Sequence, residues 1–246
     1  TTTMTIHWHT TNAADSTLQF RDATAKKWRD AKGSSVLMPD TDSGRTIHKV
    51  ELTGLTPKTD YLFRFGAQSK EFKFRTMPKD LSTPVRFIEG GDVYHQRDWM
   101  DHMNALAAKF DPAFVLIGGD LAYANSRPED KPEAVQRWYD FFDSWKSNAV
   151  APDGRLIPLL CTLGNHEVKG FWGKTPANAV GFYSLFSMPG KQGYNALDFG
   201  NYLSLILLDS GHTHPIDGVQ TKWLEKTLSE RQNVPHVLPA YHIPAY

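Results

Sequence analysis

Three apolar segments of this 246-residue chain end in small residues followed by side chains that can bind a metal ion, and this pattern constrains the fold most strongly. The segments are VRFIEGGD, AFVLIGGDLAY and RLIPLLCTLGNHE. Helix-patterned stretches separate them, WMDHMNALAAKF after the first and PEAVQRWYDFFDSWKSNA after the second. Strands that alternate with helices predict an α/β domain, in which ligands bind beyond the carboxyl ends of the strands.

The polar residues at these strand ends predict a metal site. They are Asp92, Asp120, Asn165 and His166. A lone Gly-Asp ending is most simply an Asx turn or a helix N-cap, but three endings in register favour a site. Carboxylates, an amide oxygen and imidazoles suit Fe, Mn, Zn or Mg. One carboxylate that bridges two such ions, roughly 3.5–4 Å apart, allows the pair to generate hydroxide and to hold a phosphoryl group.

Residues 1–78 have a different pattern and are predicted to form a separate β-sandwich. Short runs of alternating polar and apolar residues are separated by the turn signals GLTP and GAQS. The segment LTGLTPKTDYLFRF, followed by FKFRTMP, resembles the closing strands of a fibronectin type III domain, which implies core positions for Leu55 and Tyr61. A polar linker begins at residue 77 and ends at Pro84, and the second domain is predicted at residues 84–246.

Composition argues against several classes of function. Lysine plus arginine and aspartate plus glutamate number 27 each, so the chain lacks the net positive charge typical of proteins that bind nucleic acid or an acidic membrane. No apolar run approaches the roughly 20 residues of a membrane span. The single cysteine, Cys161, excludes an intrachain disulfide and a cysteine-based metal site. The opening TTTMTIHWHT has neither an initiator methionine nor the apolar segment of a signal peptide.

The motifs GDVYH, GDLAYA, GNHE and YHIPAY occur in an order that resembles the calcineurin-like metallophosphoesterases. Within that superfamily the chain is most similar to the purple acid phosphatases, because a β-sandwich precedes the motifs and Tyr123 stands in Gly-Asp-x-x-Tyr. The resemblance implies an αββα domain that holds Fe(III) and a divalent Fe, Zn or Mn ion. It implies that Asp92 and Tyr123 bind the ferric ion, and that Asn165 and His242 bind the divalent ion. Asp120 would bridge the two. A tyrosine that merely packs in the core is the alternative for Tyr123.

Three further residues near the motifs have expected roles. The resemblance implies that His166 contacts the substrate and protonates the leaving alkoxide, and that Glu167 lies behind the ligands and orients a histidine. His95 departs from the wider superfamily, in which many members have Asp-x-His, because the spacing here is Asp-x-x-His. We therefore expect His95 near the site, either facing the substrate or purely structural.

The stretch GHTH, which contains His212 and His214, matches the spelling of the Gly-His-x-His motif that serves both metals in this family. In the family that motif follows the single-histidine strand, whereas these two residues precede His242. We therefore expect both histidines to contact the substrate pocket without binding metal. The same reasoning predicts a true Gly-His-x-His beyond Tyr246 and a catalytic domain that is incomplete, truncated at its C-terminus.

The function predicted from the sequence is hydrolysis of phosphate monoesters by attack of a metal-bound hydroxide. A phosphodiesterase of the same superfamily is one alternative, and a non-catalytic binding protein with a degenerate metal site is another. The expected partners are small phosphorylated substrates, without nucleic acid or membrane, and the oligomeric state is left open. The resemblance implies a secreted, periplasmic or cell-surface location.

Overall fold

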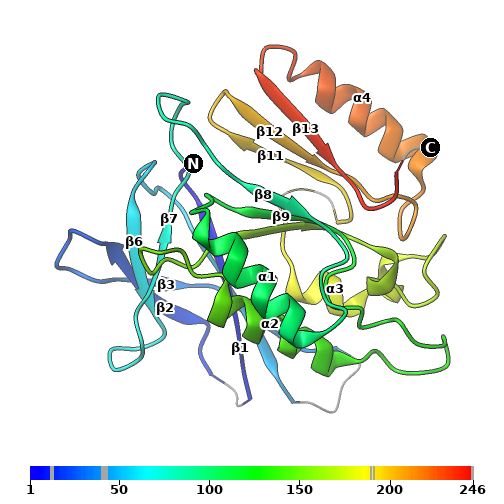
Figure 1. Cartoon of the computed structure of the whole chain (residues 1–246), viewed down its shortest axis with the longest axis horizontal. Coiled ribbons are helices and arrows are strands. Elements are labelled where there is room, and N and C mark those ends of the chain that lie inside the picture. The colour runs from blue at the N-terminus through cyan, green and yellow to red at the C-terminus, as the bar shows by residue number, and fades with distance from the viewer. Residues whose placement is uncertain (12–13, 40–43, 189, 191, 245–246) are drawn as a thin grey trace.

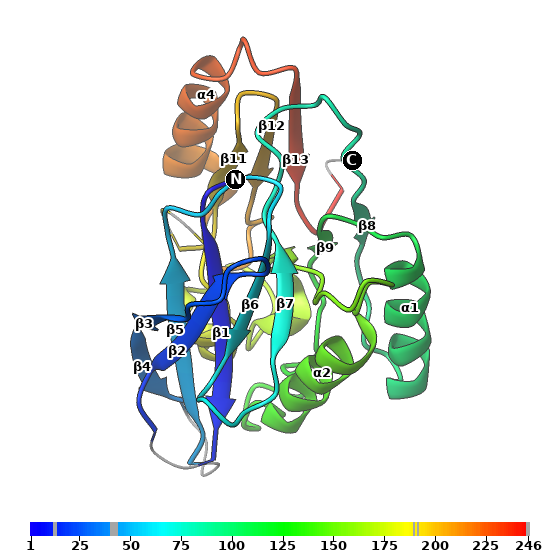
Figure 2. The same cartoon turned by 90° about the vertical axis from the view of Figure 1, so that its left-hand side faces the viewer.

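Seven strands from the first part of the chain form two antiparallel sheets. The computed structural model describes residues 1–11, 14–39, 44–188, 190 and 192–244. One sheet has the order β1-β5-β4 and the other β3-β2-β6-β7 (Figures 1 and 2). The strands are β1 (Met4–Thr10), β2 (Thr17–Asp22), β3 (Arg29–Lys32), β4 (Ser34–Leu37), β5 (Thr46–Leu52), β6 (Asp60–Arg64) and β7 (Phe72–Arg75).

The alternation of apolar and polar residues in these strands gives the sheets a shared core. Leu18, Val50 and Phe63 are among the buried residues of this cluster. Leu55 and Tyr61 are each 3% exposed, which confirms the core positions predicted for them. The Tyr61 hydroxyl also accepts a hydrogen bond from the Thr56 amide, at 2.9 Å, and so secures the turn that precedes its own strand.

The second part of the chain begins with three parallel strands in the order β10-β9-β8. The first three segments of the sequence analysis form β8 (Ile88–Gly90), β9 (Val115–Gly118) and β10 (Leu159–Thr162). The helices α1 (Arg97–Lys109) and α2 (Val135–Asn148) follow β8 and β9 and pack against each other. Trp138 of α2 is fully buried, as its place on the apolar stripe predicted.

A second sheet of three strands, β11-β12-β13, lies against the first. Phe114 and Leu116 beside and within β9 share an apolar cluster with Leu205 and Leu207 of β12, so the two sheets pack face to face. The helix α4 lies alongside the second sheet and α1 and α2 lie on the first (Figure 1), which gives the predicted order helix, sheet, sheet, helix. The elements are β11 (Asn195–Phe199), β12 (Leu203–Leu207), β13 (His236–Ala240), α3 (Val180–Leu185) and α4 (Thr221–Ser229). The short helices are η1 (Asn165–Glu167), η2 (Pro176–Asn178) and η3 (Ile216–Gln220).

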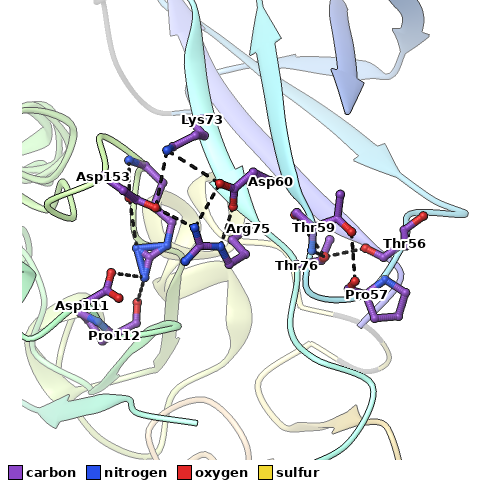
Figure 3. Close-up of polar contacts among 11 residues, drawn as sticks. Thr56, Pro57, Thr59, Asp60, Lys73, Arg75, Thr76, Asp111, Pro112 and Asp153 are labelled. Atoms are coloured by element: carbon purple, nitrogen blue, oxygen red, sulfur yellow. Dashed lines mark hydrogen bonds and ion pairs between the residues drawn. The ribbon is translucent and has the colours of Figure 1, made fainter. Parts of the chain in front are cut away.

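Ion pairs fasten the sandwich to the α/β part (Figure 3). Arg75 of β7 holds Asp60 with two hydrogen bonds, at 2.5 and 3.0 Å, and also donates to Asp153 beyond α2 at 2.7 Å. The buried Arg155 donates to Asp111 at 2.8 Å from the same turn. Because Asp60 holds the Arg75 guanidinium through two hydrogen bonds, that group is oriented for its contact with Asp153, which links the sandwich to the α/β part. Among the described residues, none of the helices combines the length and the apolar character that a membrane crossing requires.

Candidate metal centre

The loops that follow β8, β9 and β10 converge at the carboxyl edge of the first sheet. The Asp92 amide donates to the Gly119 carbonyl at 3.2 Å, and the Val93 amide donates to the Asp120 carbonyl at 3.1 Å. Asp92, Asp120 and Tyr123 all have left-handed backbone angles, with φ of +54°, +53° and +56°. Three such non-glycine residues in two adjacent loops are uncommon, and backbone strain of this kind concentrates at functional sites.

Two glycines in these endings allow the loops to approach each other. A Cβ on Gly164 would lie 2.2 Å from both the amide nitrogen and Oδ1 of Asp120. A Cβ on Gly119 would lie 2.8 Å from the Cα of Gly164 and from the ring of His242. Since no side chain fits at either position, the small residues before Asp120 and Asn165 are required by close packing around the site.

Glu167 holds the loops together from behind, through contacts with backbone amides. Its fully buried carboxylate accepts hydrogen bonds from four backbone amides, at 2.8–3.3 Å, those of Asp120, Leu121, Ala122 and Gly164. Burial and the neighbouring Asp120 raise the pKa of Glu167 to about 8, although the four amides favour its ionised form. Glu167 therefore fixes the backbone that carries the ligands.

Asp120 lies at the centre of the candidate site. Asp92, Asp120 and His242 each offer a ligand atom, and these atoms lie within 4.8 Å of one another. Asp120 is 2% exposed, and its Oδ1 accepts a hydrogen bond from the His166 amide at 2.9 Å. Burial disfavours its charge, but contacts with His242 and with the His166 amide outweigh burial and lower its pKa. A buried, ionised carboxylate between two other ligands suits a bridging position.

His242 is oriented so that one ring nitrogen faces the other ligands. Nδ1 lies 2.8 Å from the carbonyl of Gly118, and donation to this carbonyl leaves Nε2 on the side of the site. Nε2 lies 2.9 Å from Oδ1 of Asn165 and 3.4 Å from Oδ2 of Asp120. The structure thus brings Asn165 and His242 together, as predicted. Ala245 and Tyr246, the last two residues of the His-x-Pro-x-Tyr pattern, lie outside the described residues.

Tyr123 contacts the first predicted ligand through its hydroxyl, which donates to Oδ1 of Asp92 at 3.0 Å. The same hydroxyl lies 3.2 Å from Nε2 of His95. Burial raises the pKa of Tyr123, so the phenol is neutral in the metal-free protein. The structure therefore places Tyr123 and Asp92 side by side, and it places His95 next to both.

His166 lies at the mouth of the site, with 29% of its side chain exposed and Nε2 at 3.8 Å from Oδ2 of Asp120. Its ring stacks on that of Tyr123, with centroids 4.6 Å apart, and meets the edge of Phe171 at 5.4 Å. Ser126 Oγ lies 2.9 Å from Nδ1. These contacts fix the ring plane and leave Nε2 as the nitrogen nearer the carboxylates.

The loop after β12 also lies at this edge and was not predicted to do so, although LLDS is a fourth apolar strand that ends in an aspartate. Asp209 is 1% exposed and accepts hydrogen bonds from the amides of His212, Thr213 and His214, at 2.7–3.0 Å. Ser210 Oγ accepts from the His242 amide at 3.1 Å. The loop therefore lies against the loop that carries His242.

The two histidines of GHTH have different surroundings. His212 is fully buried, its Nδ1 lies 3.1 Å from the Phe171 carbonyl, and its ring centroid lies 5.7 Å from that of His242. Burial lowers the pKa of His212, and the neighbouring Asp209 opposes that shift. His214 instead contacts Asp209 through Nδ1, at 3.4 Å, and meets the edge of Tyr194.

The donors at this edge fit metal ions of hard to borderline character. Two carboxylates, an amide oxygen, a phenol and an imidazole with an oriented Nε2 are the types that iron, zinc and manganese accept. Two cavities of about 720 and 560 Å³ lie elsewhere, where the sandwich meets the α/β part, and none of the predicted ligands lines either one. The chemistry of the donors, and not cavity size, therefore identifies the site.

Comparisons with known proteins identify the family of both parts of the chain. Residues 1–76 match the model of the purple acid phosphatase N-terminal domain, and residues 86–246 match that of the calcineurin-like phosphoesterases. Two relatives from Arabidopsis thaliana are purple acid phosphatase 21, 27% identical over 220 residues, and purple acid phosphatase 15, 28% identical over 233 residues. The matches cover 83% and 81% of this chain.

The chain spans less than half the length of these relatives, 45% of the first and 42% of the second. A purple acid phosphatase from yellow lupin seeds has a similar fold, with a TM-score of 0.74 at 18% identity over 97% of this chain and 48% of that one. Because the match to the family model extends over residues 86–246, well over half of the chain, the protein belongs to the calcineurin-like phosphoesterase family.

Proposed function

We propose that this chain hydrolyses phosphate monoesters at a dinuclear metal centre. The observation that carries the proposal is the convergence of Asp92, Asp120 and His242, whose ligand atoms lie within 4.8 Å of one another. Tyr123 hydrogen-bonds to the first of these and Asn165 to the last. The two relatives named above are purple acid phosphatases, which supports the same chemistry.

The proposed ligands divide between two ions. Asp92 and Tyr123 would hold a ferric ion, Asn165 and His242 a divalent Fe, Zn or Mn ion, and Asp120 would bridge them. Two such ions would supply the nucleophile and neutralise the charge of the phosphoryl group. The chain itself fixes the positions of these ligands, through Glu167 and the two close-packed glycines, before any substrate binds.

His166 is the proposed proton donor to the leaving alkoxide. Its Nε2 lies on the side of Asp120, while Ser126 and the stacked Tyr123 ring hold the imidazole in place. A half-exposed imidazole at the mouth of the site can exchange its proton with solvent between turnovers. His95, which touches the Tyr123 hydroxyl, is proposed to face the substrate from the other side.

The remaining parts of the proposal rest on the family relationship. Small phosphorylated compounds would be the substrates, and the protein would act outside the cytoplasm, as a secreted, periplasmic or cell-surface enzyme. The sandwich would end near residue 78 and the catalytic domain would begin near residue 84. A phosphodiesterase of the same family is the alternative, and rates on p-nitrophenyl phosphate and bis(p-nitrophenyl) phosphate separate the two.

The visible spectrum tests the iron assignment. The chain loaded with Fe³⁺ and Zn²⁺ should absorb in the visible range, and Tyr123→Phe should abolish that band without loss of the fold, because only a coordinated phenolate gives it. Tyr94→Phe is the matched control, since Tyr94 is also buried but donates to Asp140. A band that survives in Tyr123→Phe would refute the assignment. Metal binding without turnover would favour a non-catalytic binding protein.

A further inference from the structure

One buried nitrogen beside the proposed centre has no role so far. Nε2 of His212 is buried and has no hydrogen-bond partner among the residues that the structure describes. Buried polar atoms are nearly always paired, by protein, water or an ion. Nε2 of His212 is therefore expected to have a partner that is not a residue of the described chain.

The other contacts of His212 determine the chemistry of that nitrogen. Nδ1 lies 3.1 Å from the carbonyl oxygen of Phe171, which can only accept, so Nδ1 carries the proton. In a neutral imidazole Nε2 then has a lone pair and must itself accept. Its partner is thus a cation or a group that donates a proton, and an unprotonated phosphate oxygen is excluded.

The position of the ring, next to His242, is compatible with a metal ion shared by the two imidazoles, although Nε2 of His212 is not among the three ligand atoms that lie within 4.8 Å of one another. The centroids of His212 and His242 lie 5.7 Å apart, with the planes at 45°. Because metal–nitrogen bonds are about 2.0–2.1 Å long, two imidazoles that share one ion have centroids roughly 5–6 Å apart. The Phe171 carbonyl fixes the tautomer of His212, and the Gly118 carbonyl fixes the tautomer of His242 in the same way.

The loop holds His212 in this position from several sides. The His212 amide donates to the Asp209 carboxylate at 2.7 Å, and the His212 carbonyl accepts a hydrogen bond from the Lys174 amide at 2.8 Å. The indole of Trp172 covers the ring, with centroids 4.5 Å apart. Such contacts beyond the ligand atom are typical of histidines that bind metal, because they set the direction of the free nitrogen.

We propose that His212 is an additional metal-binding histidine, whose Nε2 binds the divalent ion that Asn165 and His242 would hold. This inference rests on the proposed function, since it assumes an ion at that position. It does not extend to His214, whose Nδ1 faces Asp209 and whose ring packs on Tyr194. Of the two histidines in GHTH, one is assigned to the centre and the other contacts Asp209 and Tyr194 instead.

The affinity for Zn²⁺ tests the assignment. The chain is stripped with a chelator and titrated with Zn²⁺ in competition with a chromophoric indicator, as wild type and as His212→Phe, His212→Ala, His214→Ala and Asp120→Asn. We expect both His212 variants to bind Zn²⁺ about 10- to 100-fold more weakly and His214→Ala to bind as wild type does. His212→Phe keeps a ring against Trp172, and circular dichroism confirms that each variant is folded.

The outcomes separate this inference from the proposed function. If Asp120→Asn loses Zn²⁺ but His212→Phe binds it as tightly as wild type, the role of His212 is refuted and the centre stands. Equal weakening in His214→Ala would also refute it, because the loop and not the nitrogen would then matter. If Asp120→Asn binds normally, the centre itself is refuted. The ¹⁵N shift of His212 Nε2 on addition of Zn²⁺ gives a direct reading, and an unchanged shift contradicts coordination.

Discussion

The pattern His-x-His occurs twice in this chain, at His7 and His9 on strand β1 and at His212 and His214 after β12, and the two regions treat it in opposite ways. On β1 neither nitrogen of His7 has a hydrogen-bond partner within the described part of the chain. After β12, the Asp209 carboxylate accepts the amides of both histidines. Identical spacing is therefore compatible with very different environments.

Charge accounts for the difference. Burial, reinforced by cationic neighbours, lowers the pKa of both His7 and His9 to about 4. Burial also lowers the pKa of His212, but there the neighbouring Asp209 and Asp120 are anionic and oppose the shift. Lysine and arginine side chains around an imidazole repel a metal ion, whereas carboxylates beside an imidazole attract one. The neighbours, and not the spacing, decide which histidines can bind metal.

The largest expected effect comes from displacing the carboxylate at the edge. Gly164→Ala places a methyl group 2.2 Å from Asp120 and must move that residue away from His242. We expect the free energy of unfolding to fall by about 2–3 kcal/mol and the affinity for Zn²⁺ to fall at least 10-fold. Chemical denaturation and Zn²⁺ titration measure the two quantities.

The matched control for this substitution is Gly90→Ala at the end of β8. A Cβ there has no atom within 4 Å, so we expect stability and Zn²⁺ affinity close to those of wild type. Equal behaviour of the two alanine variants would show that the position of Asp120 does not depend on the close approach of the loops.

An intermediate effect is expected from the histidines of β1 at acid pH. Their pKa is about 4 in the folded chain and near 6.5 when unfolded, so the unfolded chain binds more protons between these values. The free energy of unfolding should therefore fall as the pH drops from 6.5 towards 4, by about 2.5 kcal/mol per ring at pH 4.5. The charged or titratable groups facing the two rings are Arg45, His48, Lys49 and Lys146.

His9→Phe should remove part of this acid sensitivity, because phenylalanine can pack on Tyr139 and Phe142 without binding a proton. Unfolding measured at pH 7.0 and 4.5 gives the difference for each variant. His102→Phe, at an exposed position of α1, should leave the difference unchanged. If His9→Phe and wild type lose equal stability on acidification, the burial of this ring does not control the pH dependence.

The smallest expected effect concerns His166, whose Nδ1 lies against the hydroxyl of Ser126. Ser126→Ala removes the group that lies 2.9 Å from Nδ1 of His166, at an exposed position. We expect turnover of p-nitrophenyl phosphate to fall about 3- to 5-fold, which corresponds to a hydrogen bond of about 1 kcal/mol or less. Bound metal, measured by mass spectrometry, should not change. Ser229→Ala at the end of α4 is the control, and a loss of metal in Ser126→Ala would mean that Ser126 supports the ligands instead.

The sequence was sufficient to predict that these polar side chains lie at one edge of the sheet. Asp92, Asp120 and Asn165 each follow a strand of the same parallel sheet, and the carboxyl ends of such strands lie at one edge. The helical stripe of α2 and the core positions of the sandwich were predictable for a similar reason, because periodicity reports which face is buried.

The position of His212 was not predictable in the same way, because it depends on how two distant strands pair. Strand β12 pairs in parallel with β13, with Leu207 opposite Ala240, so the loops that follow both strands end side by side. The sequence shows two apolar strands but not their neighbours in the sheet. The role of Glu167 was missed because its partners are backbone amides, which are present at every residue except proline and leave no pattern in the sequence.

Glu167 fixes the backbone of the two loops independently of the side chains that face the site. The carboxylate that ties the two loops together is not itself directed at an ion, so the loops keep their course when a neighbouring donor is exchanged. A replacement at position 92, 123 or 165 would thus change a side chain and leave these backbone contacts in place, whereas loss of the Glu167 carboxylate would remove the hydrogen bonds that hold the loops for all three positions at once.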